Sequence, residues 1–216
     1  MVAGEPCDVA GADHTQVADE LSRLIRRAAT APDLDSLRGL EGIGARAYFG
    51  LLRAALGPHI GMGRRSRRPP EDPGNALLSL AYSLLLTQVY AAVEIAGLEP
   101  YLGFYHGDRW GRPALALDLM EEFRPVIADR LVVGCVRKRI IGADDFVQAD
   151  DLACGLTRDA FGRFCHQFSA AMARRITHPD TGESVTYRRC VELQARRLAR
   201  VLRGEAEHYE PFEMER

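Results

Sequence analysis

The chain has 216 residues, of which 47% are hydrophobic and 27% charged, and its formal net charge is -2. This length is enough for one large domain with a buried core, and the composition is that of an ordinary soluble protein. The near-neutral balance excludes a polycation, so any contact with nucleic acid must come from local clusters of basic side chains.

The cysteines and the apolar segments indicate the cellular compartment in which the protein is expected. The five cysteines are scattered and form no C-x-x-C pair, which argues against a disulfide framework and against a zinc or iron-sulfur site. No charged segment followed by an apolar run begins the chain, so no signal peptide is expected. The longest apolar stretch, residues 76–96, is interrupted by polar side chains and is predicted to be a buried helix, not a membrane span. These features predict a cytoplasmic protein without a membrane contact.

The first third of the chain is predicted to contain two helices. Residues 1–13 have no periodicity and are expected to be a disordered N-terminus. Apolar side chains at helical spacing predict a helix over residues 15–29, which Pro32 ends, and a second helix over residues 35–56. Glu41 lies near the start of the second helix.

A loop rich in arginine follows, over residues 57–74. Its cluster is a candidate for binding phosphate, although the same composition suits a solvated flexible loop, and both interpretations stay open at this point. Asp72 and Pro73 are an N-cap and a first helical residue, and predict a nearly all-apolar helix over Pro73–Ile95 that Gly97 ends. The cluster consists of Arg64, Arg65, Arg67 and Arg68.

The next stretch combines a histidine loop with an acidic helix. His106 lies in a Gly-rich loop, and a helix is predicted from about residue 113 to 133, with Pro125 as a kink or an interruption. Asp118 and either Glu121 or Glu122 share a face of that helix, because residues three or four apart lie together. Carboxylates beside an imidazole suit a divalent cation that activates an oxygen nucleophile. The alternative is a solvated acidic face that complements the helix dipole.

The C-terminal half is predicted to be helical, and the protein to be all-α. Residues 142–156 have loop composition with a short strand near 146–147. Thr157 is predicted to cap a helix to about residue 176, and Ser184 to cap a last helix that ends at Gly204. The apolar face of the first of these helices is Phe161, Phe164, Phe168 and Met172. We therefore expect one multi-helix domain over residues 14–204 and a C-terminal tail over residues 205–216.

Three stretches in order carry a family resemblance: LEGIGARAYFG at 40–50, RRPPEDPGNALLSLAYSLL at 67–85, and LGFYHGDRWGRPALALDLMEEFRPVIADRLV at 102–132. Together with TYRRCVELQARRLARVLRGE at 186–205, they resemble the metal-dependent integrase of CRISPR adaptation, the endonuclease that inserts new spacers into CRISPR arrays. The resemblance covers the family's helical C-terminal catalytic domain almost end to end.

The resemblance implies a metal site and the residues that build it. A Mn²⁺ or Mg²⁺ ion would be held by Glu41, by His106 of the GF-x-H loop, and by Glu121 of the LDLMEEFRP helix. Asp118 matches a neighbouring acid that contributes to the catalytic site in some members, and Glu122 is a weaker candidate. The arginines that flank these ligands are candidates for holding phosphates, and Arg124 is equally a candidate for an ion pair with one of the glutamates. The flanking set is Arg109, Arg112 and Arg124.

The resemblance also implies a reaction and partners. The family transfers a DNA 3'-hydroxyl onto a phosphodiester of the CRISPR repeat, so double-stranded DNA with free 3' ends and repeat DNA are the expected substrates. A homodimer and a small ferredoxin-like partner protein are the expected assembly. Full-length members begin with a β-rich domain that the residues before Glu41 do not resemble. The alternative is therefore a truncated, non-enzymatic remnant that folds and binds DNA or a partner but cannot integrate. A helix-turn-helix regulator is disfavoured because no short two-helix unit has a basic recognition helix.

Overall fold

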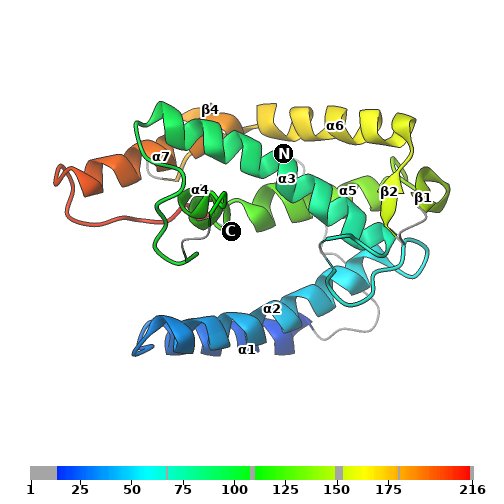
Figure 1. Ribbon diagram of the computed structural model, residues 1–216, viewed down its shortest axis with the longest axis horizontal. Helices are drawn as coiled ribbons and strands as arrows, with labels where there is room; N and C mark the ends of the chain where they lie inside the picture. Colours follow the sequence, from blue (N-terminus) through cyan, green and yellow to red (C-terminus); the bar gives the residue numbers. More distant parts are fainter. Residues whose placement is uncertain (1–13, 67, 108–109, 149–152, 180, 215–216) are drawn as a thin grey trace. The chain divides into compact units, whose positions relative to one another are not determined.

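The fold is largely helical, as predicted, and divides into two compact units. The computed structural model describes residues 14–66, 68–107, 110–148, 153–179 and 181–214. The first unit comprises Met1–Ala76 with Gly142–Gly155, and the second comprises Leu77–Ile141 with Leu156–Arg216. Figure 1 shows the helices and the two short sheets of these units.

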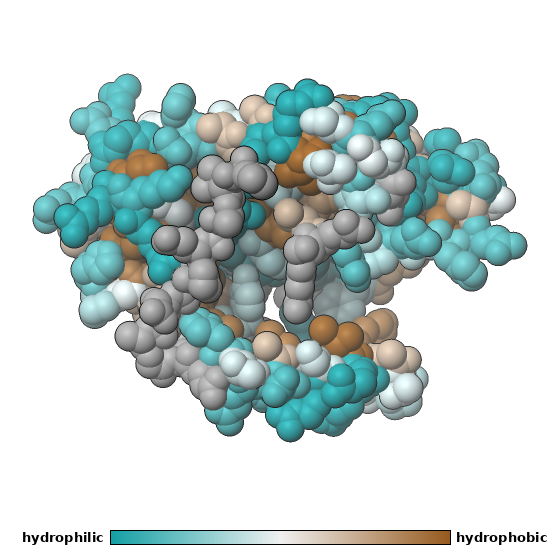
Figure 2. Space-filling model, turned by 180° about the vertical axis from the view of Figure 1, so that it is seen from behind, coloured by the Kyte–Doolittle hydropathy of each residue, from teal (hydrophilic) through white to brown (hydrophobic). Residues whose placement is uncertain are grey.

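A helical hairpin begins the first unit. Helix α1 (His14–Ala28) packs against α2 (Leu34–Leu56), and both predicted helices are confirmed within one residue at each end. The Asp33 side chain caps α2 by accepting a 2.7 Å hydrogen bond from the Ser36 backbone N–H. The hairpin presents hydrophilic and hydrophobic side chains on its surface, visible at the bottom of Figure 2, and Ile25 is 70% exposed.

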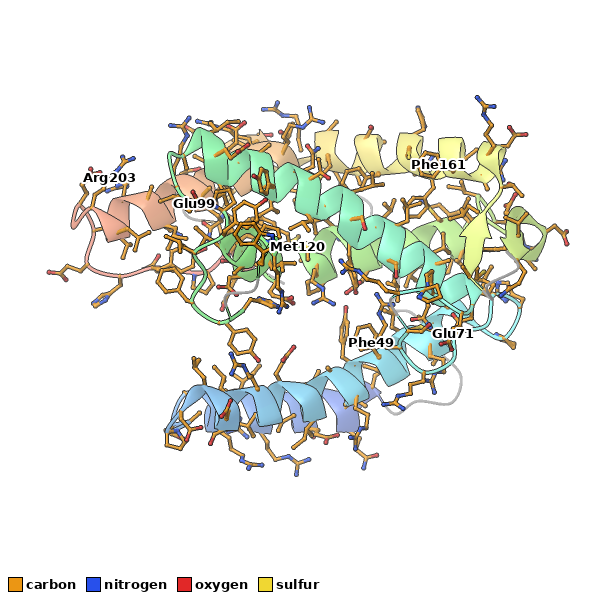
Figure 3. All side chains as sticks on the ribbon, in the orientation of Figure 1. Phe49, Glu71, Glu99, Met120, Phe161 and Arg203 are labelled. Atoms are coloured by element: carbon orange, nitrogen blue, oxygen red, sulfur yellow. The ribbon has the colours of Figure 1, made fainter. Side chains whose placement is uncertain are left out.

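The side-chain amide of one buried residue, Asn75, holds the arginine loop of the first unit in place through hydrogen bonds. Asn75 is fully buried, and its Nδ2 donates to the carbonyl of Arg64 while its Oδ1 accepts from Arg65 Nη1 at 2.9 Å. The Arg65 guanidinium lies 5.9 Å from the Phe49 ring, which Figure 3 labels. The same unit holds a single 3-10 turn (Ala143–Asp145), strand β1 (Phe146–Gln148) at the predicted position, and its partner β2 (Cys154–Leu156), which was not predicted.

Helix α3 (Pro73–Ile95) is the core helix of the second unit and has the predicted bounds. By length and hydropathy alone α3 qualifies as a membrane span, the one such candidate among the described residues. One side of α3 is nevertheless buried, as expected for a core helix, whereas Ile95 at its C-terminal end is 59% exposed. The fully buried side chains include Leu77, Leu78, Leu85, Val89 and Val93.

The predicted acidic helix is interrupted where Pro125 indicated. Helix α4 (Ala114–Met120) ends one residue before Glu121, a turn follows, and a π-helix (Arg124–Asp129) leads into α5 (Arg130–Arg137). Proline lacks the N–H that an α-helix would require at this position, so the chain changes helical register there. Glu121 and Glu122 consequently lie in a turn and not on a continuous helix face.

The predicted end of the first C-terminal helix and the predicted start of the second are wrong. Helix α6 (Arg158–Ala173) is capped by Thr157 as predicted but stops before residue 176, because Arg175–Thr177 forms strand β3. Ser184 does not cap the last helix. It begins β4 (Ser184–Thr186), which pairs with β3 in antiparallel register, and Thr186 caps α7 (Tyr187–Leu202). Along α6 only Phe161 departs from the predicted buried face, at 47% exposed (Figure 3).

Candidate metal centre

The histidine loop is held against α4 by one carboxylate, that of Asp118. This side chain is 13% exposed. Its Oδ2 accepts hydrogen bonds from the backbone N–H of Phe104 at 2.6 Å and of Tyr105 at 3.0 Å. Its Oδ1 accepts the backbone N–H of His106 at 2.9 Å. Both oxygens of Asp118 therefore bind the loop, which favours a positioning role over direct ligation.

Asp118 also orients the imidazole of His106. The Nδ1 atom lies 2.6 Å from Asp118 Oδ1. Burial alone would raise the pKa of Asp118, but the hydrogen bonds from the His106 side chain and from three backbone N–H groups outweigh it, and the pKa is lowered. Since an ionised carboxylate only accepts hydrogen bonds, Nδ1 carries the proton and Nε2 carries the lone pair that a metal needs. His106 Nε2 makes no hydrogen bond to the part of the chain that the structure describes.

Gly103 permits the close approach of this loop to α4. A Cβ atom at residue 103 would lie 2.7 Å from the Cβ of Ala114 and 2.9 Å from Asp118 Oδ2. Any larger side chain would push the loop away from the carboxylate that binds it. The glycine of the GF-x-H motif is thus required by packing.

Glu121 pairs with Arg124, the ion pair that the sequence leaves open beside a phosphate contact. The Arg124 Nη1 group donates to both Glu121 oxygens, at 2.6 and 2.7 Å. Its guanidinium carbon also lies 4.2 Å from the centre of the Tyr82 ring, and the Tyr82 hydroxyl donates to Asp129 at 2.5 Å. Burial alone would lower the pKa of Arg124, but Glu121 raises it, so the guanidinium stays charged. The Glu121 side chain remains 41% exposed and accessible to a ligand.

Glu122 has a structural role. Its carboxylate accepts hydrogen bonds from Gln194 Nε2 at 2.8 Å, from the Phe212 backbone N–H at 2.7 Å, and from the Tyr209 hydroxyl. Tyr82, Asp129, Gln194 and Tyr209 were all missed in the sequence, because their partners lie far along the chain and no local spacing connects them.

The other predicted site residues lie as follows. Glu41 is exposed on α2 in the first unit. Arg64 and Arg68 are exposed and Arg112 is half-buried, whereas Arg65 is bound to Asn75. Arg67 and Arg109 lie outside the described residues.

Among the described residues, no three His, Cys, Asp or Glu side chains are grouped closely enough to hold a metal ion. The second unit nevertheless offers two donors. The His106 imidazole has its proton on Nδ1, beside Asp118, and a lone pair on Nε2, and the Glu121 carboxylate is partly exposed. This donor set fits a hard divalent cation that also keeps water or phosphate oxygen in its shell.

Comparison with known proteins gives the chain its family. The family model described as CRISPR associated protein Cas1 matches residues 7–170. The chain belongs to the Cas1 family. The CRISPR-associated endonuclease Cas1 3 of Thermus thermophilus is 42% identical over 194 residues, which cover 90% of this chain and 58% of that protein.

Solved structures of Cas1 proteins share the fold. The CAS1 protein from Thermotoga maritima matches with a TM-score of 0.79 and 26% identity, covering 92% of this chain and 60% of that one. A chain of the partial Cas6-RT-Cas1–Cas2 complex matches with a TM-score of 0.81 and 28% identity, again covering 60% of its own length. The chain spans about three fifths of the length of these Cas1 relatives.

Proposed function

We propose that this protein is a metal-dependent DNA endonuclease and integrase of CRISPR spacer acquisition. The observation that carries the proposal is the Asp118–His106 pair, which fixes Nδ1 as a donor at 2.6 Å and leaves Nε2 as a ligand. Membership of a family whose relatives are called endonucleases supports the same conclusion.

The proposed ligands are Glu41, His106 and Glu121, around Mn²⁺ or Mg²⁺. When bound, such an ion polarises a phosphodiester and stabilises the negative charge that develops on its oxygens. His106 would supply Nε2, and Asp118 would hold the imidazole in that tautomer. Glu121 would share its carboxylate with Arg124, whose position on the Tyr82 ring keeps the guanidinium in place. Arg112 and the exposed arginines of residues 64–68 are proposed to contact phosphates.

The substrates and partners follow from the proposed reaction. The protein would take double-stranded DNA with free 3' ends and transfer a 3'-hydroxyl onto a phosphodiester of repeat DNA. A similar chain is found in a Cas6-RT-Cas1–Cas2 complex, which supports a second Cas protein as partner. We propose that partner to be a small ferredoxin-like protein, with the Cas1-family chain as a homodimer in the cytoplasm.

The test is Mn²⁺-dependent strand transfer on a branched DNA substrate. The variants Glu41→Gln, His106→Ala and Glu121→Gln should each lose activity while the far-ultraviolet circular dichroism stays helical. Asp35→Asn is a matched control, since its carboxylate is 91% exposed on the same helix as Glu41. Activity that persists in all three variants would refute the ligand set. A parent chain inactive with and without the partner protein would support the alternative, a folded remnant that cannot integrate.

A further inference from the structure

The C-terminal segment after α7 folds back onto the turn that carries Glu121 and Glu122. Helix α7 ends at Leu202, and residues 203–214 have no helix or strand. Phe212 is nevertheless only 6% exposed, and its ring stacks on the fully buried Phe123 at 5.0 Å with an angle of 27°. This stacking anchors the segment directly beside the two glutamates.

Three donors from this region converge on Glu122. Gln194 of α7 is 1% exposed, and its Nε2 donates to Glu122 as well as to the carbonyl of Glu210 at 3.1 Å. The Tyr209 hydroxyl and the Phe212 backbone N–H donate to the two carboxylate oxygens. Burial and the Glu122 charge raise the pKa of Tyr209, so its hydroxyl keeps its proton and remains a donor. We call Gln194, Tyr209 and Phe212 the C-terminal clamp.

The clamp acts on the short turn between α4 and the π-helix, which contains Glu121, Glu122 and Phe123. Three backbone hydrogen bonds join this turn to the helices on either side: Glu121 N–H to Asp118 at 3.3 Å, Phe123 N–H to Met120 at 3.0 Å, and Ile127 N–H to the Phe123 carbonyl at 2.9 Å. The Glu121 side chain pairs with Arg124, and the Glu122 side chain binds the clamp. Consecutive side chains of a turn point in different directions. Fixing Glu122 on one side therefore also fixes the direction of Glu121 on the other.

We propose that the C-terminal clamp is a positioning device for the metal ligand Glu121. The two adjacent glutamates are chemically identical. The clamp occupies the carboxylate of Glu122, whereas Glu121 pairs with Arg124 and is still 41% exposed, so Glu121 is the one of the two that a cation can reach. The clamp residues touch neither metal nor substrate. They act through the backbone of the turn, as outer-shell partners of a metal ligand do. This inference rests on the proposed function, because it takes Glu121 to be a ligand.

The test compares Mn²⁺ affinity among matched variants of the full chain. Mn²⁺ is titrated into each variant, and the electron paramagnetic resonance signal reports the concentration of free Mn²⁺. Tyr209→Phe removes one donor and keeps the ring, and truncation after residue 208 removes Tyr209 and Phe212 together. Truncation after residue 214 is the control, because it leaves all three clamp residues and also Met214, whose sulfur accepts a hydrogen bond from the Tyr187 hydroxyl. Removing a residue that supports a metal ligand typically weakens metal binding by about 10- to 100-fold. We expect a loss of this size for truncation after residue 208, a smaller loss for Tyr209→Phe, and no loss for the control.

Two further readouts separate positioning from loss of folding. Strand transfer by Tyr209→Phe should recover at saturating Mn²⁺, which an unfolded fraction could not do, and its circular dichroism should match that of the parent. A Mn²⁺ dissociation constant within twofold of the parent in both clamp variants would overturn the inference. Glu121→Gln is the benchmark. If it weakens Mn²⁺ binding and the clamp variants do not, the inference alone fails; if it leaves Mn²⁺ binding unchanged, the proposed ligand set fails and the inference fails with it.

Discussion

Replacing Asp118 by asparagine tests the histidine loop with a change of almost no volume. The carboxylate accepts four hydrogen bonds, two at each oxygen. An asparagine has one accepting oxygen, so either orientation turns an NH₂ group toward two N–H donors. One orientation leaves Phe104 and Tyr105 without an acceptor, and the other leaves both donors of His106 without one. Since a hydrogen bond to a charged group contributes about 1.5–3 kcal/mol, losing two destabilises the closed loop by about 3 kcal/mol or more.

The expected signal is local. A loss of about 3 kcal/mol corresponds to roughly 100-fold faster amide hydrogen exchange at residues 104–106, because each 1.4 kcal/mol is a factor of about ten. Nitrogen-15 spectra of the His106 ring should show that the proton is no longer confined to Nδ1, and Mn²⁺ affinity should fall by about 10- to 100-fold. The exposed substitution Asp35→Asn should change none of these. If Asp118→Asn keeps the loop amides protected and the imidazole in the same tautomer, the positioning role assigned to Asp118 is wrong.

Further outcomes follow from packing and charge. Gly103→Ala should displace the loop and weaken Mn²⁺ binding as Asp118→Asn does, because its Cβ would lie 2.7 Å from α4; Gly134→Ala, with nothing within 4 Å, should not. The lowered pKa of Asp118 means that its contribution is present above its ordinary value of 3.8 and is lost as pH falls through the lower folded value, so amide protection should be constant down to about pH 4 and decline below it. Phe123→Ala should lower the free energy of unfolding in urea by about 3–5 kcal/mol, whereas the half-exposed Phe161→Ala should cost less than about 1 kcal/mol.

The sequence predicted those elements whose signals are local. Helix α3 has its predicted bounds because Asp72 and Pro73 begin it and Gly97 follows its end, all within a few residues. The start of α7 is misplaced because serine is by residue type at least as good a cap as threonine, which favours Ser184 over Thr186. The backbone pairing of β3 with β4 decides between them, and that pairing has no signature in side-chain periodicity.

The candidate site could be predicted in its residue types but not in their roles. Glu121 and Glu122 are acids at helical spacing from Asp118, and nothing in that spacing separates a ligand from a support. The distinction comes from partners elsewhere: Asp118 binds a loop that begins more than ten residues earlier, and Glu122 binds donors that follow it by 72 to 90 residues. The choice of Glu121 as a ligand rested on family resemblance, and its association with Glu41 stays a prediction.

The π-helix over Arg124–Asp129 has a consequence for sequence change in this part of the chain. A π-turn holds one residue more than an α-turn, so residues five apart lie near one face of it, whereas on an α-helix, at about 100° per residue, they are separated by roughly 140°. Arg124, which pairs with Glu121, and Asp129, which accepts from Tyr82, are five residues apart and share a face because of this wide turn. Substitutions on the exposed surface of this segment should be accepted readily. A change that restores a regular α-helix without removing a residue should instead turn Asp129 away from Tyr82. The helical register between Arg124 and Asp129 is therefore expected to matter more than most of the side chains between them.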